Sequence, residues 1–296
     1  MKRIKIKSFN DVKKFMSKFK ILDLSEFFIL YESTNEELPK DVVISRMKKT
    51  LEVMRDSIKS GLVKKNVTKS GMISGGAYLM NRFIEKGHSL LSKEFSEIIR
   101  NSLAVSEANA CMKKIVAAPT AGAAGVIPGA LFKIAEKHNI EDKELIKSLF
   151  VAGGIGEVIS LQASLAGAVH GCQAEVGSAS AMTAGAITYL FNNDIEAIES
   201  SAAFALKNIL GLVCDPIAGL VEIPCVKRNV NAALNSIASA EMALCGIRTK
   251  IPLDEVIIAM AEIGNKMSDS LKETSLGGLA ATETAKKITS EINNSL

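Results

Sequence analysis

Three cysteines in the second half of the chain have neighbours that suit metal binding. Cys172, Cys214 and Cys225 form the pattern Cys-x41-Cys-x10-Cys. Gly171 precedes the first, a proline stands two residues after the second, and Pro224 precedes the third. A metal-binding thiolate needs a fixed backbone and an accessible sulfur, and glycine or proline beside each cysteine favours both. The spacing matches neither a ferredoxin run nor a zinc ribbon, so the bare pattern predicts a metal site of unspecified type.

The other two cysteines, Cys111 and Cys245, have apolar neighbours and are typical of structural residues inside helices. Five cysteines are too few, and odd in number, for a disulfide scaffold in a chain of 296 residues. Residues 1–10 are polar and basic, unlike a secretory signal. We therefore expect a reduced, cytoplasmic environment.

Two segments, residues 119–125 and 153–157, are rich in glycine and could bind an anion. Helix starts without bulky side chains present free N–H groups and the positive end of the helix dipole, which suit a carboxylate or phosphate. Neither segment matches a P-loop or a dinucleotide-binding fingerprint. Small residues that permit close helix crossing are an equally good interpretation of both segments.

Charge and hydropathy argue against several classes of protein. The net charge of +4 is too small to indicate a nucleic-acid partner, and 23% charged residues of mixed sign exclude a disordered chain. Residues 115–132, 158–174 and 176–193 carry no charged side chain and approach the length of a membrane span. Proline, glycine and polar residues interrupt them, and Glu175 alone separates the last two. Buried helices are therefore favoured over a membrane protein.

The spacing of apolar residues predicts a mostly α-helical fold, because alternating runs are nearly absent and no Asn-Gly or Asp-Gly hairpin signal occurs. Residues 1–61 are predicted to form a helical N-terminal segment that packs as one unit with a large helical domain, residues 62–296. One helical period runs from Leu90 to Val105. Helix breaks are expected at Pro119, Gly153-Gly154, Asp194, Pro216, Pro224, Pro252 and Gly277-Gly278.

Residues 1–20 carry eight Lys or Arg against a single Asp and predict a short amphipathic helix. Its basic face is either solvated, which is the favoured interpretation, or a docking face for an acidic partner. The apolar residues at helical spacing are Phe9, Val12, Phe15, Met16 and Phe19.

Four longer segments resemble a known family. They are AAPTAGAAGVIPGAL (117–131), GCQAEVGSASAM (171–182), LKNILGLVCDPIAGLVEIPCVKRN (206–229) and LKETSLGGLAATETAKK (271–287). In order and spacing they are similar to the α-subunit of iron–sulfur-dependent L-serine dehydratase, from roughly residue 40 to the end. The segments that contain the three cysteines are the most specific to that family.

The resemblance implies a mostly helical catalytic subunit whose buried, Gly/Pro-interrupted helices carry a [4Fe-4S] cluster. By motif match the cluster ligands are Cys172, Cys214 and Cys225. The implied reaction is the deamination of L-serine to pyruvate and ammonia without pyridoxal phosphate. Three protein ligands leave one iron free to act as a Lewis acid on the substrate hydroxyl. The resemblance also implies a separate β-subunit, and the chain could form a homo-oligomer.

The substrate carboxylate has candidate binding groups in the first glycine-rich segment. These are the Thr120 hydroxyl and the N–H groups of Ala121 and Gly122. Lys227 and Arg228 follow the third cysteine and could offset the charge of a cluster or bind the carboxylate. A solvated basic pair at a helix start is an equally good interpretation.

The general base is harder to assign, because the chain has only three histidines. His170 lies two residues before the first of the three cysteines, and it and Lys227 are candidates for the base. A catalytic histidine could instead come from the β-subunit. His138 is expected at the surface, and Glu175 is expected to cap a helix.

Several positions depart from the family pattern. Residues 70–77 lack an Asp and a Thr that the family usually has in this loop, Gln162 stands for the usual Asn, and His170 stands where Gly is common. The C-terminal tail has no cysteine that could be a fourth ligand. These departures leave two alternatives open: another β-substituted amino acid such as cysteine as the substrate, or a non-catalytic helical assembly subunit.

Overall fold

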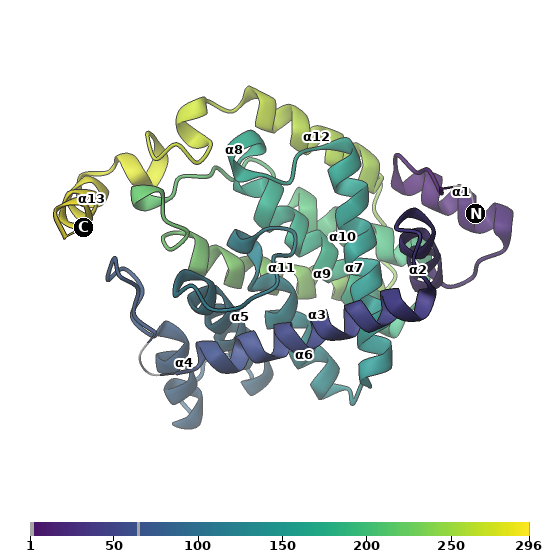
Figure 1. Cartoon of the computed structure of the whole chain (residues 1–296), viewed down its shortest axis with the longest axis horizontal. Helices are drawn as coiled ribbons and strands as arrows, with labels where there is room; N and C mark the ends of the chain where they lie inside the picture. Colours follow the sequence, from purple (N-terminus) through teal and green to yellow (C-terminus); the bar gives the residue numbers. More distant parts are fainter. Residues whose placement is uncertain (1–2, 64–65, 296) are drawn as a thin grey trace.

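The computed structural model describes residues 3–63 and 66–295 and is built from helices (Figure 1). Within these residues there are thirteen α-helices and no extended strand, so the mostly α-helical prediction is confirmed. Short 3-10 turns (η1, η3, η4 and η5) and one π-helical turn (η2) lie between them. In chain order the elements are α1 (Phe9–Phe19), α2 (Leu24–Asn35), α3 (Lys40–Gly61), α4 (Gly76–Glu85), α5 (Lys93–Ala110), η1 (Ala121–Ala123), α6 (Val126–Lys137), α7 (Asp142–Gln162), α8 (Gly167–His170), η2 (Gln173–Gly177), α9 (Ser178–Phe191), α10 (Ile195–Lys207), η3 (Ile217–Gly219), α11 (Cys225–Leu244), α12 (Leu253–Lys266), η4 (Asp269–Leu271), η5 (Gly278–Ala281) and α13 (Glu283–Ser295).

Helix α9 lies at the centre of the molecule and packs against α7, α10 and α11 (Figure 1). Every residue from Ser178 to Tyr189 is buried. Small side chains allow the helices to approach closely: a Cβ on Gly185 would overlap the side chain of Ile155 on α7. The uncharged stretch 176–193 therefore forms a buried core helix. Among the residues that the structure describes, no helix is both long enough and apolar enough to cross a bilayer.

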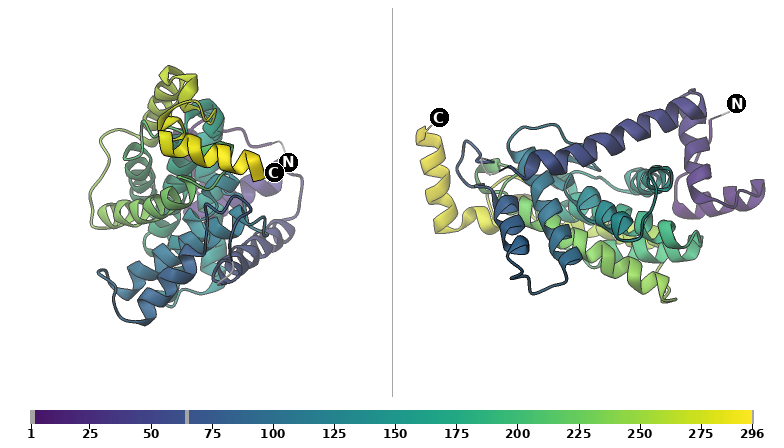
Figure 2. Two further views of the ribbon diagram at one scale, coloured as in Figure 1. Left: turned by 90° about the vertical axis from the view of Figure 1, so that its left-hand side faces the viewer. Right: turned by 90° about the horizontal axis from the view of Figure 1, so that it is seen from below.

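The long helix α3 runs along one face of the molecule and contacts α2, α5 and α7 (Figure 1). The N-terminal helices lie at one end of the long axis, and α13 lies at the other end (Figure 2). A single hydrophobic core contains Phe27 and Leu51 together with Ile127 and Ile155. Residues before and after position 61 thus share one core, while the boundary at this position stays a prediction.

Helix α1 is amphipathic, as predicted: Phe9, Val12 and Met16 of its apolar face are buried, whereas Phe19 is exposed. Asp254 of α12 accepts hydrogen bonds from the N–H groups of Phe9 (2.7 Å) and Asn10 (3.0 Å). Lys13 forms an ion pair of 2.7 Å with the buried Glu199 of α10. Part of the basic face therefore packs against acidic residues of this chain. The first two residues of the basic stretch lie outside the described residues.

The helix break predicted at Gly153-Gly154 is wrong, because both glycines lie inside α7. Gly154 faces α2, and a Cβ there would overlap the ring of Phe28. A Cβ on Gly153 would meet open space. The alternative interpretation of this segment, close helix crossing through a small residue, is confirmed at Gly154.

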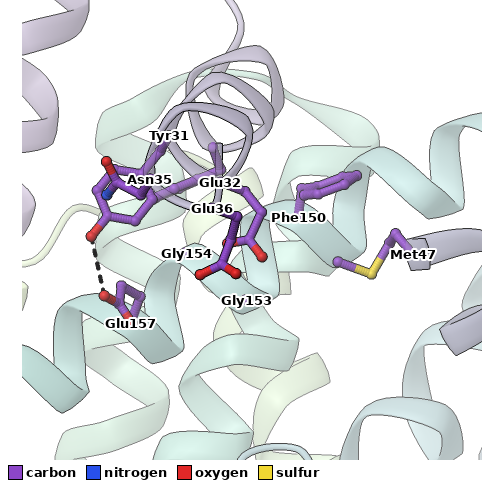
Figure 3. A pocket seen from close by; sticks show the side chains of 10 residues that line it. Tyr31, Glu32, Asn35, Glu36, Met47, Phe150, Gly153, Gly154 and Glu157 are labelled. Carbon is purple, nitrogen blue, oxygen red and sulfur yellow. Dashed lines mark hydrogen bonds between the residues drawn. The ribbon is translucent and has the colours of Figure 1, made fainter. Parts of the chain in front are cut away.

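The turn of α7 that contains Gly153 lines a hollow of about 360 Å³ between α2, α3 and α7 (Figure 3). The carboxylates of Glu32, Glu36 and Glu157 line it, and Tyr31 donates a hydrogen bond of 3.1 Å to Glu157. Burial, and the negative charges of Glu36 and Glu157, raise the pKa of Glu32. No Lys or Arg is among the described residues that line the hollow. The predicted anion site at residues 153–157 is therefore wrong, since the segment has no free helix start and faces carboxylates.

The other predicted helix breaks are confirmed. The helix predicted to run from Leu90 begins three residues later, at Lys93, which is the first residue of α5. The Ser92 hydroxyl caps this helix by accepting the N–H of Phe95 at 3.5 Å. Leu90 lies in the preceding loop and is 99% exposed.

Alanine substitutions at the two adjacent glycines of α7 should change stability in opposite directions. Gly153→Ala should raise the free energy of unfolding by about 0.5–1 kcal/mol, because alanine has the higher helix propensity and the methyl group meets open space. Gly154→Ala should lower it by about 1–3 kcal/mol, because the methyl group overlaps Phe28. Urea denaturation measures both changes. Shifts of the same sign would contradict this packing.

Candidate functional site

The three predicted metal-binding cysteines lie on three segments that meet in space. Cys172 opens the helix that η2 and α9 form together, and Cys225 is the first residue of α11. Cys214 lies between α10 and η3. The turn η2 contacts α8, α11 and η1. Gly171 has a φ of 76°, and a Cβ there would lie 2.8 Å from the carbonyl oxygen of Leu212, so glycine is required before the first cysteine.

The three thiols share one electrostatic environment. Burial raises the pKa of Cys172 to about 12 and the pKa of Cys225 to about 11, and it also raises the pKa of Cys214. Negative charge on Cys172 or Cys225 would raise the pKa of Cys214 further, whereas the Arg228 guanidinium lowers the pKa of both Cys172 and Cys225. Without a metal the three groups are therefore protonated at neutral pH, and metal binding would release their protons.

Arg228 of α11 holds the segment that carries Cys214. Its Nη2 lies 2.8 Å from Asp215 Oδ1, and its Nη1 donates a hydrogen bond of 2.8 Å to the carbonyl oxygen of Val213. The other carboxylate oxygen of Asp215 accepts the N–H of Leu279 at 2.8 Å. The guanidinium thus has protein acceptors beside the thiols. Its predicted contact with a substrate carboxylate stays a prediction.

Asn229 joins the first glycine-rich segment to the third cysteine. Its Oδ1 accepts the N–H of Gly125 at 2.9 Å, and its Nδ2 donates to the carbonyl oxygens of Gly122 (2.7 Å) and Cys225 (2.9 Å). Sequence reasoning missed this residue, because an asparagine in a helix carries no signal of a partner about one hundred positions away. It lies directly after the Lys-Arg pair that did attract attention.

The predicted carboxylate-binding groups lie on η1 and at its start. Among the described residues, the N–H groups of Ala121 and Gly122 have no hydrogen-bond acceptor. The hydroxyl oxygen of Thr120 is buried, and it has no hydrogen-bond partner of normal geometry. Two free N–H groups and one unsatisfied hydroxyl at the same turn are the donors that a carboxylate needs.

Glu175 of η2 is the residue that sequence reasoning undervalued. Its carboxylate lies next to the predicted carboxylate-binding turn: a Cβ on Gly122 would lie 3.4 Å from Oε2 and 3.5 Å from Oε1. Burial raises the pKa of Glu175, the nearby Thr120 hydroxyl lowers it, and the Glu273 carboxylate raises it. Glu175 is the one charged residue between positions 158 and 193, and that isolation was the available sequence signal.

The two weak candidates for the general base have other surroundings. His170 is buried, its Nδ1 accepts the N–H of Ser164 at 3.2 Å, and its Nε2 lies 3.2 Å from Asn265 Oδ1. Both ring nitrogens are therefore engaged in holding the turn before the first cysteine. Lys227 is exposed on α11, and its charge lowers the pKa of Glu107. A catalytic role for either residue stays a prediction.

The loop that departs from the family pattern is tied to the segment between Cys214 and Cys225. Glu222 of that segment is buried and accepts hydrogen bonds of 2.7 Å from the hydroxyls of Thr68 and Ser70. Ser70, the first residue of this loop, therefore lies against the segment between Cys214 and Cys225.

The family model described as "Serine dehydratase alpha chain" matches residues 14–280 of this chain. The chain belongs to the serine dehydratase alpha-chain family. The "Probable L-serine dehydratase, alpha chain" of Bacillus subtilis (strain 168) is 43% identical over 287 residues, which cover 96% of this chain and 95% of that protein. The "L-serine dehydratase, alpha chain" of Peptoniphilus asaccharolyticus is 40% identical over 257 residues, which cover 87% and 88% of the two chains.

A longer relative shows that this family also occurs within larger chains. The "L-serine dehydratase" of Streptomyces coelicolor is 37% identical over 238 residues, which cover 78% of this chain but 52% of that protein. About half of the Streptomyces protein therefore lies outside the similar region. The family resemblance predicted from the four sequence segments is confirmed.

Asn229→Asp should disrupt the turn that carries Thr120. The substitution keeps the shape of the side chain but replaces the donating NH2 group by an oxygen, so two partly buried carbonyl groups lose their donor. We expect the free energy of unfolding to fall by about 2–4 kcal/mol, which urea denaturation measures. Asn231→Asp, at an exposed position of the same helix, is the matched control and should change stability by less than about 0.5 kcal/mol. Equal losses of stability in the two variants would contradict the role of the Asn229 hydrogen bonds in holding this turn.

Proposed function

We propose that this chain is the catalytic α-subunit of an iron–sulfur L-serine ammonia-lyase, which converts L-serine to pyruvate and ammonia. The observation that carries the proposal is the meeting of Cys172, Cys214 and Cys225 in one environment, in a member of the serine dehydratase alpha-chain family. The names of the Bacillus and Peptoniphilus relatives support L-serine as the substrate.

A [4Fe-4S] cluster fits the chemistry of this donor set. Thiolates are the usual ligands of such clusters, and Arg228 is placed to offset their negative charge. Among the described residues, no three His, Cys, Asp or Glu side chains are close enough together to hold one metal ion. The three cysteine side chains can lie farther apart when they hold a cluster, because each thiolate binds a different iron atom. When bound through three cysteines, it supplies Lewis acidity at an iron that has no protein ligand.

We propose that residues of this chain bind and orient the substrate. In the proposed site, the Thr120 hydroxyl and the N–H groups of Ala121 and Gly122 bind the substrate carboxylate. Asn229 holds this turn against the start of α11. Loss of the α-proton and the β-hydroxyl converts serine to aminoacrylate, which tautomerises and hydrolyses to pyruvate and ammonia.

A separate β-subunit completes the proposed enzyme. The designation of the relatives as alpha chains supports this partner, and so does the greater length of the Streptomyces L-serine dehydratase. We propose that the β-subunit supplies the group that accepts the α-proton, because both nitrogens of His170 are engaged. Assembly into a homo-oligomer and a cytoplasmic location are part of the same proposal.

Substitution of each cysteine ligand tests this function. The complex of the chain with its β-subunit, prepared without oxygen, should form pyruvate from L-serine. Each of the substitutions Cys172→Ser, Cys214→Ser and Cys225→Ser should lower kcat by at least about 100-fold. Loss of a cluster ligand should reduce activity at least as much as loss of a residue that only hydrogen-bonds to a metal ligand. Coupled detection of pyruvate measures the rate.

Cys245→Ser is the matched control. Cys245 is exposed at the end of α11. The Cys245→Ser variant should therefore form pyruvate at a rate within about twofold of the wild-type value. Full activity in any of the three ligand variants would contradict the proposal and favour a non-catalytic assembly subunit. Faster elimination from L-cysteine than from L-serine would retain the lyase but change its substrate.

A further inference from the structure

Glu175 differs from the buried Glu107, Asp215 and Glu222 near the site, because no cation or pair of donors satisfies it. Glu222 accepts two hydroxyl hydrogen bonds, Glu107 accepts the N–H of Ala77 at the start of α4, and Asp215 pairs with an arginine. Among the described residues, Glu175 forms no ion pair, and the neighbouring Thr120 hydroxyl lacks good hydrogen-bond geometry. Arg228, whose guanidinium acts on the Cys172 and Cys225 thiols, is engaged with Asp215.

Two glycines from different elements lie beside the Glu175 carboxylate. A Cβ on Gly167 of α8 would lie 2.9 Å from Glu175 Oε2 and also 2.9 Å from Cys214 Sγ, so a side chain there would displace one of them. A Cβ on Gly122 of η1 would be in ordinary van der Waals contact with both carboxylate oxygens. The carboxylate therefore lies between the carboxylate-binding turn and one of the cysteines.

A negative charge withdrawn from water without a partner lowers stability, and a ligand of opposite charge would remove that cost. An α-amino acid carries its ammonium and its carboxylate on one carbon atom. A site that binds the carboxylate at Thr120 and Gly122 must therefore have an acceptor for the ammonium within a few ångströms. Glu175 is the carboxylate that lies against this turn.

We propose that Glu175 binds the α-ammonium group of the substrate and thereby selects amino acids over carboxylic acids that lack the amino group. The inference rests on the proposed function, because it takes the turn at Thr120 as the site of the substrate carboxylate. Glu175 is a specificity-determining residue in this arrangement.

Binding of two unreactive ligands tests the inference. L-Alanine has the ammonium and carboxylate of serine, propionate has the carboxylate alone, and neither has a hydroxyl group that can be eliminated. In the oxygen-free complex with the β-subunit, Glu175→Gln should weaken L-alanine binding by about 10- to 100-fold, because a charge-assisted contact is lost. Propionate binding should change by less than about threefold. Isothermal titration calorimetry measures both dissociation constants.

Kinetics separate this role from that of a base. Glu175→Gln should raise the KM for L-serine by a similar factor and change kcat by less than about threefold, and Glu175→Asp should restore part of the affinity. Glu241→Gln, at an exposed position of α11, is the matched control and should change neither constant. A large fall in kcat with unchanged L-alanine binding would overturn the inference and indicate proton transfer instead.

The wild-type complex provides a test that does not depend on the folding of a variant. It should bind L-alanine at least about tenfold more tightly than propionate, and equal affinities would overturn the inference. If the complex forms pyruvate from L-serine but its affinity for L-alanine does not depend on Glu175, only this inference is refuted. Dependence of L-alanine binding on Glu175 without any lyase activity would refute only the proposed function.

Discussion

The ion pair between Arg228 and Asp215 is the interaction on which the geometry of the site depends. It joins α11, which begins with Cys225, to the segment that carries Cys214. Removing two charges from water is unfavourable unless further hydrogen bonds satisfy them, and here the carbonyl oxygen of Val213 and an N–H of the 277–281 segment do so. Asn229 connects the same end of α11 to the glycine-rich turn through hydrogen bonds to Gly122 and Gly125. One helix start thus positions two thiols and the proposed carboxylate site.

The small residues that pack the helices closely also shape the site. Gly185 and Gly154 allow α9 and α2 to approach α7. At the edge of that core, Gly122 and Gly167 lie beside the Glu175 carboxylate. Small residues therefore permit close helix packing in one place and border the proposed ligand site in another.

Sequence reasoning predicted those features that depend on neighbouring residues. The helical period, the breaks at the prolines and the glycine before Cys172 all follow from local backbone preferences, and the structure has them. The interpretation of Gly153-Gly154 as a break failed, because a ring from α2 fills the space beside Gly154 and the helix continues. The roles of Asn229 and Glu175 depend on partners far away in sequence. Periodicity and local motifs contain no information about such partners.

Anomalous diffraction at the iron absorption edge, from crystals of the complex grown without oxygen, tests the central claim most directly. We expect iron density bounded by the sulfur atoms of Cys172, Cys214 and Cys225, with one iron that has no protein ligand. Iron bound elsewhere while the three cysteines remain free thiols, or no iron after anaerobic reconstitution, would contradict the claim that these residues hold a catalytic cluster.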